Sequence, residues 1–395
     1  MTRVLELSAQ AAGGVRAHIR QVSQLLAKDG HQVLLAGPSN VISPADDAVG
    51  GACLRTYQIN IGARPSGADL KALRQLKQLA ATAQVIHAHG LRAGALAVLA
   101  VKRLPAAKRP RVVVTLHNLP VGSAPTRLVG QVLQLVVVKG ADYVLTVSPD
   151  LLEKAKQLGL KAGEIAVVPA PARGCADCGC MDHAAQPEIS QASAQSSHAG
   201  SGVGTGSGVG AGSSYGASSA AGSGATPCVL TIARLAPQKG LDLLLEAAAL
   251  IKQRGIDFTW LVAGDGPLKA QLNQQIAAAA LPVKLLGRRE DIGALLSQAD
   301  VVVQTSYWEG QPLTLREAMQ AGRAIVATDV GGSAYTLAGC GQLVEPQAGP
   351  LADAVVAVIS DPKRRESLEA ASRAAVAKIP GETQLREQLD RVLKL

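Results

Sequence analysis

The sequence predicts an α/β protein with two Rossmann-like domains, each built on a doubly wound parallel sheet. Short apolar runs alternate with amphipathic segments along both halves of the chain, which is typical of parallel strands joined by helices. Glycine turns follow several apolar runs, as expected where a strand leads directly into a helix. Residues 173–227 contain a Cys-containing segment and then a tract of Ser, Gly and Ala, which predicts a disordered linker between two separate cores.

The first half opens with a predicted strand at Arg3–Ser8 and a turn that contains Gly13 and Gly14. Apolar residues at helical spacing follow in 15–28, and Gly30 ends that helix. Ser148 and Pro149 suit the N-cap and first position of a later helix. Further strands are predicted at 32–36, 85–89, 112–116, 143–147 and 165–168.

The second half repeats the alternation of strand and helix. Turns at 264–267 and 287–289 each follow an apolar run, and residues 382–395 form a last amphipathic helix. The predicted strands of this half are 228–232, 258–263, 283–286, 301–304 and 324–327.

Residues 306–322 carry the pattern most informative about function. Pro312 suits the first helical position and Gly322 the position just past the helix end, so Glu309 lies in the preceding loop and Glu317 on the helix. The first backbone N–H groups of such a helix, at Leu313 and Thr314, can bind a phosphate. The two carboxylates lie at most about 12 Å apart along a helix axis. This layout suits a nucleotide-sugar; the alternative is a surface helix with two solvated glutamates.

The 306–322 stretch resembles the glutamate-pair motif of family 4 retaining glycosyltransferases, also called glycosyl transferases group 1. The resemblance covers roughly 1–170 and 228–395 and is strongest in 228–345. It implies the GT-B fold, with an acceptor domain at 1–172, a donor domain at 228–378 and a terminal helix at 379–395 that crosses onto the first domain. It also implies an enzyme of hexosyltransferase type that moves a sugar from a nucleoside-diphosphate sugar to an acceptor hydroxyl with retention.

The resemblance assigns roles to particular residues. Glu309 and His117 would act at the reacting sugar, and Glu317 would hold the nucleotide ribose. Fixed cations stabilise the charge that builds on a departing diphosphate, a role that fits Arg234 and Lys239; a surface salt bridge is the alternative. Further donor contacts would come from Gly13, Gly14, Arg288, Gly310, Leu313 and Thr314.

Three histidines lie at or near predicted strand ends. His117 ends a strand in Thr-Leu-His-Asn, where a family histidine approaches the sugar. His89 could contact acceptor or sugar, or serve only the structure, whereas His87 falls inside its strand and is expected to be structural.

The sequence indicates neither a metal nor another cofactor for the reaction. It has no Asp-x-Asp pair, and family 4 enzymes need no metal. Cys175, Cys178, Cys180 and His183 offer four soft ligands within nine residues, but zinc sites usually draw ligands from two separated pairs. Two departures from the family are Pro169-Ala-Pro171-Ala at the domain joint and Tyr335 where a glutamate is common.

The charge of the chain is uneven. Residues 1–172 carry 20 Lys and Arg against 9 Asp and Glu, a net charge of +11, whereas the rest carries −2. Nucleic acid is disfavoured because few aromatics lie among the basic residues. An anionic membrane is a candidate partner through Lys71, Arg74, Lys77 and the segment 102–111, at about 1 kcal/mol per basic residue. The helix that carries the first three is expected to bury Leu70, Leu73 and Leu76; a solvated basic surface is the alternative.

No apolar stretch reaches the roughly 20 residues that span a bilayer, and the N-terminus lacks a signal-peptide pattern. We therefore expect a cytoplasmic protein, peripheral on the inner face of the membrane if it docks there. The acceptor would be a glycan, a lipid-linked sugar or a small molecule, in keeping with cell-envelope glycan or glycolipid synthesis. The alternatives are a non-catalytic sugar-nucleotide adaptor and another GT-B enzyme, such as an epimerase or a phosphorylase-like enzyme.

Overall fold

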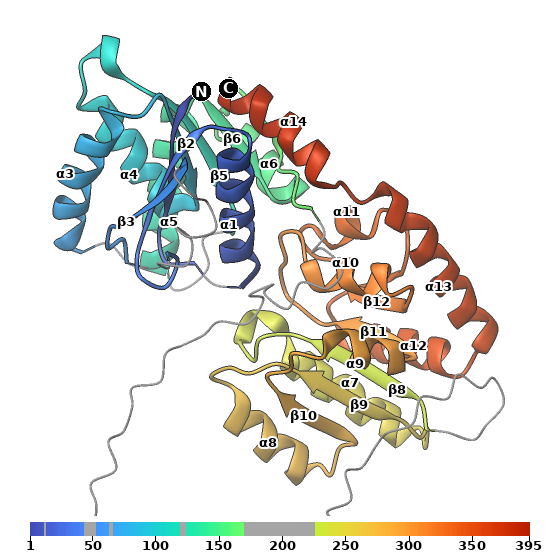
Figure 1. The fold of residues 1–395 in the computed structure, drawn as a ribbon. Helices are drawn as coiled ribbons and strands as arrows, with labels where there is room; N and C mark the ends of the chain where they lie inside the picture. The colour runs from blue at the N-terminus through green and yellow to red at the C-terminus, as the bar shows by residue number, and fades with distance from the viewer. Residues whose placement is uncertain (12, 43–52, 63–65, 119–123, 170–225) are drawn as a thin grey trace, which may run out of the picture.

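The computed structural model describes residues 1–11, 13–42, 53–62, 66–118, 124–169 and 226–395. Two α/β domains lie one beside the other, each with a parallel sheet between helical layers (Figure 1). The fold predicted from the sequence is confirmed. The predicted linker and the Cys175, Cys178, Cys180 and His183 cluster lie outside the described residues.

The N-terminal domain is built on a seven-stranded sheet in the order β3-β2-β1-β4-β5-β6-β7, with every pairing parallel. Helices α3, α4 and α5 cover one face, and α1 and α6 cover the other. The strands are β1 (Arg3–Ser8), β2 (Gln32–Gly37), β3 (Leu54–Gln58), β4 (Val85–His89), β5 (Arg111–Leu116), β6 (Tyr143–Thr146) and β7 (Gly163–Ile165). The helices are α1 (Gly13–Lys28), α3 (Ala68–Ala80), α4 (Leu91–Lys102), α5 (Ala124–Gly140) and α6 (Pro149–Gln157), with a 3-10 turn η2 (Ala106–Lys108).

The C-terminal domain has a six-stranded parallel sheet in the order β10-β9-β8-β11-β12-β13. Its hydrophobic core has two layers, one under α7, α8 and α12 and one under α9, α10, α11 and α13. The strands are β8 (Cys228–Ile232), β9 (Thr259–Ala263), β10 (Val283–Gly287), β11 (Val301–Gln304), β12 (Ala324–Thr328) and β13 (Gln342–Val344). The helical elements are η3 (Pro237–Lys239), α7 (Leu241–Gln253), α8 (Lys269–Ala278), α9 (Ile292–Gln298), α10 (Leu313–Gln320), α11 (Ser333–Leu337), α12 (Ala348–Ile359), α13 (Pro362–Ala375), η4 (Val376–Lys378) and α14 (Glu382–Leu393).

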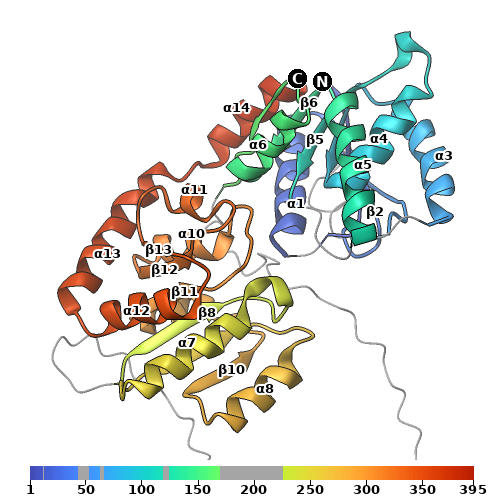
Figure 2. The ribbon, with the colours of Figure 1, turned by 180° about the vertical axis from the view of Figure 1, so that it is seen from behind.

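Helix α14 leaves the C-terminal domain and packs on the N-terminal one (Figure 2). Its buried residues Leu385, Leu389, Val392 and Leu393 join the core beneath α1 and β1. The Gln388 side chain accepts from Val167 N at 2.7 Å and donates to Glu164 Oε1 at 2.7 Å. Arg111 donates to the carbonyl of Val392 at 2.8 Å, so this arginine braces the helix and is not part of an open basic surface.

Several local predictions need correction. Helix α1 begins at Gly13, two residues before the predicted start, and β7 lies at 163–165 where 165–168 was predicted. Pro312 is the N-cap of α10, with an extended backbone, where the first helical position was predicted. Leu70, expected inside, is 66% exposed because it faces outward from α3. Strands β3 and β13 were not predicted, since their short segments lack a strong apolar pattern.

Within the described ranges, no helix is both long and apolar enough to cross a membrane.

Candidate active site

The loop that follows β11 holds the first part of the candidate site. Glu309 is 9% exposed, and its Oε1 lies 2.6 Å from the Nζ of Lys239. The hydroxyl of the buried Ser306 donates to the same oxygen at 2.6 Å. Thus Lys239, predicted to grip the donor diphosphate, and Glu309, predicted to contact the sugar, form one hydrogen-bonded group.

The backbone explains why these two residues meet. Gly240 has a φ of +59°, and a Cβ there would lie 1.9 Å from the carbonyl oxygen of Thr305, so glycine allows η3 to pack directly on the loop after β11. Thr305 Oγ1 donates to the Lys239 carbonyl at 2.8 Å, and Tyr307 N donates to the Gln238 carbonyl at 3.0 Å. Both contacts place the lysine side chain beside Glu309.

The same loop also touches the N-terminal domain. A Cβ on Gly310 would lie 2.5 Å from Val147 Cγ2 and 3.5 Å from the His117 carbonyl oxygen. The indole N–H of Trp308 donates to Asp150 at 2.9 Å. His117 and Glu309 therefore lie where the carboxyl ends of the two sheets face each other, as expected for ligands of doubly wound sheets.

The N-terminus of α10 forms another contact between the domains. A Cβ on Gly14 would lie 3.2 Å from Leu313 Cδ1, so the glycine start of α1 faces the first turn of α10. The first N–H groups of a helix, here those of Leu313 and Thr314, have no acceptor within the helix, and Pro312 provides no side-chain cap. These groups give the site a positive, hydrogen-bond-donating face next to Gly14.

Glu317 lies one turn along α10, and no hydrogen bond or ion pair to its side chain is formed among the described residues. Burial raises the pKa of its carboxyl group to about 7. A half-buried carboxylate without a partner can accept hydrogen bonds from ribose hydroxyls. Gly13, the other glycine assigned to the donor, starts α1 with a φ of +55°.

Arg234 and Arg288 are placed differently from Lys239. Both side chains are exposed at loops that follow strands. Arg234 has no side-chain hydrogen bond or ion pair within the part of the chain described, so it can turn toward a ligand. Arg288 follows Gly287, whose φ of +69° makes the turn after β10.

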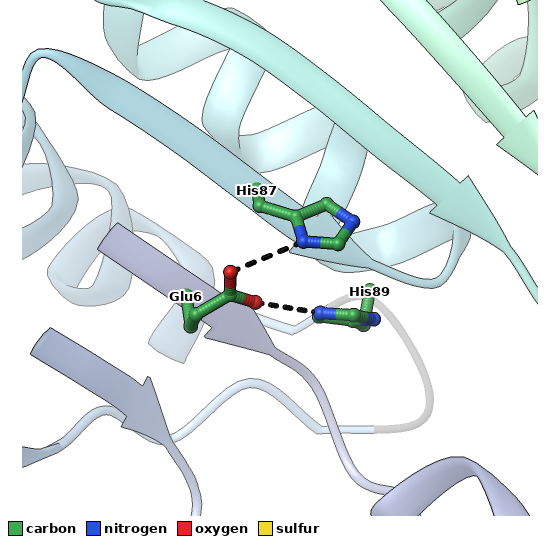
Figure 3. Close-up of side chains that lie close together, drawn as sticks. All are labelled: Glu6, His87 and His89. Atoms are coloured by element: carbon green, nitrogen blue, oxygen red, sulfur yellow. Dashed lines mark hydrogen bonds and ion pairs between the residues drawn. The ribbon is translucent and has the colours of Figure 1, made fainter. Parts of the chain in front are cut away.

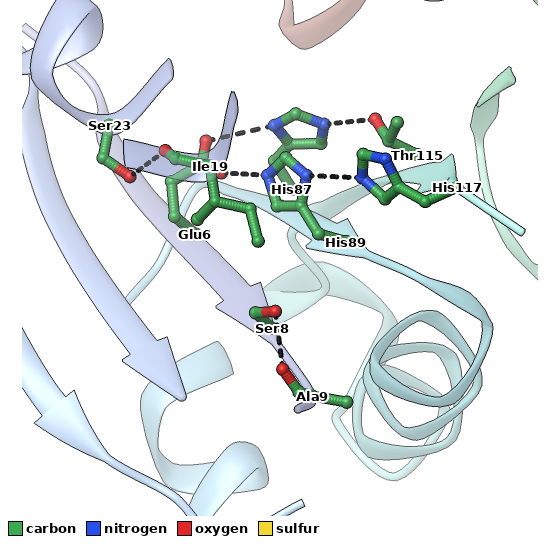
Figure 4. Close-up of polar contacts among 9 residues, drawn as sticks. All are labelled: Glu6, Ser8, Ala9, Ile19, Ser23, His87, His89, Thr115 and His117. Atoms are coloured by element: carbon green, nitrogen blue, oxygen red, sulfur yellow. Dashed lines mark hydrogen bonds and ion pairs between the residues drawn. The ribbon is translucent and has the colours of Figure 1, made fainter. Parts of the chain in front are cut away.

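A buried histidine cluster lies in the carboxyl halves of β1 and β4, where Glu6 faces His87 and His89 (Figure 3). The carboxylate of Glu6 lies 3.1 Å from His87 Nδ1 and 2.7 Å from His89 Nε2. His87 Nε2 contacts the Thr115 hydroxyl at 2.8 Å, and His89 Nδ1 contacts His117 Nε2 at 3.3 Å (Figure 4). Both ring nitrogens of His89 are therefore engaged, and the chain of contacts ends at His117.

Glu6 is a buried carboxylate within the cluster. Burial acts to raise the pKa of Glu6, but the charges and hydrogen bonds of His87 and His89 lower it to about 2. Burial lowers the pKa of His89 to about 4 and that of His117 well below its usual range. At neutral pH the Glu6 carboxylate thus faces a neutral His89 ring.

Sequence reasoning missed four residues of this region: Glu6, His18, Ser306 and Arg316. His18, on α1, has its ring centre 6.0 Å from that of His117, and its buried Nδ1 has no hydrogen-bond partner. Arg316, on α10, is 2% exposed, and its Nε and Nη1 are likewise without partners. For Glu6 the sequence does offer a signal, because a charged residue inside the apolar run Val4-Leu5-Glu6-Leu7 must be buried with a partner.

Among the residues that the structure describes, Glu6, His87 and His89 are spaced so that they could hold a metal, since their ligand atoms lie within 4.8 Å of one another. Each of those atoms already has a hydrogen-bond partner in the cluster, and all three side chains are buried. The arrangement fits a satisfied hydrogen-bond network better than an ion site.

Two family models match the chain. Residues 226–361 match the model described as glycosyl transferases group 1, and residues 13–171 match the glycosyl transferase 4-like domain. Each half of the chain thus resembles a glycosyltransferase domain family, and the two parallel-sheet domains have the GT-B architecture.

Relatives extend the comparison. The chain is 35% identical over 149 residues to an alpha-D-kanosaminyltransferase of Streptomyces kanamyceticus, matching 36% of this chain and 39% of that protein. It is 35% identical over 150 residues to a phosphatidyl-myo-inositol mannosyltransferase of Mycobacterium tuberculosis, matching 35% of this chain and 39% of the relative. The chain thus spans about two fifths of the length of the curated relatives it matches.

Solved structures show the same fold over the whole chain. The Anabaena protein HepE in complex with UDP-glucose superposes with a TM-score of 0.71 at 18% identity, covering 100% of both chains. Sucrose-phosphate synthase from Thermosynechococcus elongatus gives a TM-score of 0.71 at 18% identity, covering 100% of this chain and 98% of the other.

Proposed function

We propose that this chain is a retaining glycosyltransferase that moves a hexosyl group from a nucleoside-diphosphate sugar to an acceptor hydroxyl. The observation that carries the proposal is the pairing of Lys239 with Glu309 beside the α10 N-terminus, where both domains meet. Cations and helix N–H groups suit a diphosphate, and a carboxylate beside them suits sugar hydroxyls.

In the proposed reaction the acceptor oxygen attacks the anomeric carbon from the side of the leaving group. The bond from that carbon to the diphosphate oxygen breaks, and the departing oxygen takes the acceptor proton. Lys239, Arg234 and the first N–H groups of α10 would stabilise the developing charge, so the proposal includes no metal or other cofactor. Glu309 and His117 would hold the sugar, and Glu317 the ribose.

The remaining contacts follow the same geometry. Gly13 and Gly14 would approach the diphosphate from the N-terminal domain, and Arg288 would approach the base. A uridine nucleotide is the first donor to test, because HepE has been solved with UDP and with UDP-glucose. Free thiols at Cys53, Cys228 and Cys340 are in keeping with the reducing cytoplasm, where we place the reaction.

We further propose that the α3–α5 face of the N-terminal domain binds an anionic membrane, and that the acceptor is lipid-linked. Leu128, Val132 and Leu135 point outward from one face of α5 and are 63%, 53% and 43% exposed. Leu70 of α3 and Leu133 of α5 line one groove together with residues of α4, so the three helices form one continuous face.

Charge supports an anionic surface as the occupant of this face. Lys71, Arg74 and Lys77 are exposed on α3, next to the outward-facing Leu70. An apolar strip with basic neighbours is typical of a segment that lies in a membrane interface. A cell-envelope glycolipid would be one acceptor of this kind.

The test of the function is a thermal shift of the full chain with UDP, GDP, ADP and their sugar conjugates. A ligand at 100 times its Kd adds about 2.7 kcal/mol to the free energy of unfolding. We expect a shift with one nucleotide, and Lys239→Met should abolish it. Arg254→Gln removes one positive charge at the exposed C-cap of α7 and should keep the shift. No shift with any nucleotide would contradict the proposal.

Product analysis separates the alternatives. A transferase transfers the sugar to an acceptor or, slowly, to water, with the anomeric configuration retained. An epimerase would convert the nucleotide-sugar without releasing the nucleotide. A non-catalytic adaptor would show the thermal shift and no turnover.

A further inference from the structure

The polar groups of the histidine cluster all lie on one face of the N-terminal sheet. Side chains two residues apart along a strand share a face, so Glu6 joins Val4, His87 and His89 join Val85, and Thr115 joins Val113. Val4, Val85 and Val113 belong to the core beneath α1. A single hydrogen-bonded chain therefore runs under α1, from the buried carboxylate toward the C-terminal domain.

The direction of hydrogen bonding along this chain follows from its charged end. An ionised carboxylate only accepts hydrogen bonds. His89 Nε2, 2.7 Å from Glu6, must therefore be protonated and act as the hydrogen-bond donor. A neutral imidazole has one N–H, which leaves His89 Nδ1 as an acceptor. His117 Nε2, 3.3 Å from that atom, is then the donor.

The last ring in the chain keeps one nitrogen for a ligand. His117 Nδ1 has no hydrogen-bond partner within the described ranges, and 7% of this residue remains exposed. The His117 backbone lies against Gly310, next to Glu309. The available nitrogen thus belongs to a residue whose backbone lies beside the proposed sugar site.

We propose that Glu6, acting through His89, is a positioning residue that holds His117 as the Nε2–H tautomer, so that Nδ1 accepts a hydrogen bond from a substrate hydroxyl. The identity of that hydroxyl rests on the proposed function. The tautomer does not, because it follows from contacts inside the N-terminal domain.

Thr115 provides the matched comparison. Its hydroxyl lies in the same buried cluster and contacts His87 Nε2 at 2.8 Å, but among the described residues it forms no hydrogen bond with the ring of His89 or His117. Thr115→Val removes one buried hydrogen bond of the cluster and leaves the Glu6–His89–His117 path intact. Glu6→Leu removes the acceptor on which that path depends.

The experiment measures two-bond ¹H–¹⁵N correlations of the imidazoles in the full chain, labelled at its seven histidines. The His117 signals are assigned by their loss in His117→Gln. At pH 7 we expect the wild-type ring to show a protonated Nε2 and a bare Nδ1. A protonated Nδ1, or an average of both tautomers, would overturn the proposal without any further variant.

The variants test the cause of the tautomer. In Glu6→Leu we expect His117 to lose the single Nε2–H form, whereas Thr115→Val should keep it. An unchanged His117 spectrum in folded Glu6→Leu would show that Glu6 does not set the tautomer. If Glu6→Leu fails to fold, as judged by circular dichroism, the wild-type spectrum still decides whether the chain of hydrogen bonds exists as argued.

The kinetic arm connects the tautomer to catalysis. Glu6→Leu should lower kcat by about tenfold or more and leave the Kd for the nucleotide-sugar within about twofold. The reason is that the His117 ring stays in place, while its proton is no longer held on Nε2. Thr115→Val should stay near wild-type kcat. Absence of transfer in every protein would count against the proposed function, while the spectra would still report on the positioning role.

Discussion

The ammonium group of Lys239 lies 2.6 Å from a carboxylate oxygen of Glu309, although 70 residues separate them in the chain. Their side chains are only 22% and 11% exposed, so little water screens the two charges. Each group is the other's main charge partner in the absence of a ligand. A diphosphate entering beside Lys239 would compete for the ammonium group and release Glu309 toward sugar hydroxyls. Donor binding and sugar recognition are therefore expected to be coupled.

This pairing makes the effects of substitution non-additive. Removing one partner leaves the other partly buried and uncompensated, so Lys239→Met and Glu309→Gln should each lower the free energy of unfolding by about 1–3 kcal/mol. The double variant should cost less than the sum of both. Denaturant unfolding of the four proteins measures the coupling, and strictly additive values would show that the pair contributes nothing. Glu309→Ala should keep the fold and lose transfer, and unchanged turnover would refute its role.

Glu317 predicts a pH dependence of stability. Its carboxyl ionises near 4.5 in an unfolded chain and near 7 in the folded protein, so ionisation costs free energy only in the folded state. Relative to Glu317→Gln, the wild type should lose stability as the pH rises from about 4.5 to about 7 and lose no more above that. If the free energy of unfolding changed with pH in the same way in both proteins across this range, the Glu317 carboxyl would not be desolvated.

The same group predicts how donor binding responds to pH. Ribose hydroxyls donate most strongly to an ionised carboxylate, so affinity for UDP-glucose, whose diphosphate does not titrate here, should weaken as the pH falls below about 7. Glu317→Gln should bind more weakly throughout and show no such trend. Calorimetric titration at pH 5.5, 6.5 and 8 provides the comparison.

A larger residue at position 310 is expected to disturb the contact between the two domains sterically. An added Cβ would lie 2.5 Å from Val147 Cγ2, so in Gly310→Ala either Val147 or the Glu309 loop must shift, which disturbs the contact between the domains. Transfer should fall about 100-fold or more, since a misplacement of about 1 Å has that effect. Gly293→Ala, on α9 with nothing within 4 Å, is the control and should leave activity unchanged. Equal activity of both variants would show that this contact is dispensable.

Helix α14 predicts that the C-terminal end stabilises the N-terminal domain. Leu389 is 2% exposed in the core under α1, so Leu389→Ala should cost about 2–5 kcal/mol. Leu70→Ala removes the same atoms from a side chain that is 66% exposed and should cost far less. Chemical denaturation followed by circular dichroism compares them, and similar losses would mean that α14 does not pack as described.

The proposed membrane face predicts a loss of lipid binding without a loss of catalysis. Val132→Asp, on the exposed side of α5, should reduce co-flotation with liposomes that contain anionic lipid at low salt. Asp353→Ala, on the C-terminal domain, should not. Transfer to a water-soluble acceptor should remain near wild type in both. Absence of flotation of the wild type would refute the docking surface.

Much of the fold could be read from the chain itself, for local reasons. Strands and helices of a parallel α/β domain each have their own apolar period, and glycine or proline marks many of their ends. The segment from β11 to Gly322 shows this well, since its strand, loop, helix and stop occur in order. The elements that escaped prediction, β3 and β13, are edge strands of the two sheets, and their segments lack a run of buried apolar residues.

The candidate site was predicted only in part, because spacing along a chain does not fix distances across a fold. The family resemblance assigned roles to Lys239, Glu309 and His117 as separate residues. That Lys239 and Glu309 pair, that Gly310 lies on Val147, and that Glu6 contacts two histidines depend on which strands are neighbours in the sheet. The sequence by itself determined the two α/β domains and most of their elements; the tertiary structure decided which polar groups share a buried environment, because sheet order and domain contact bring together residues that are distant in the chain.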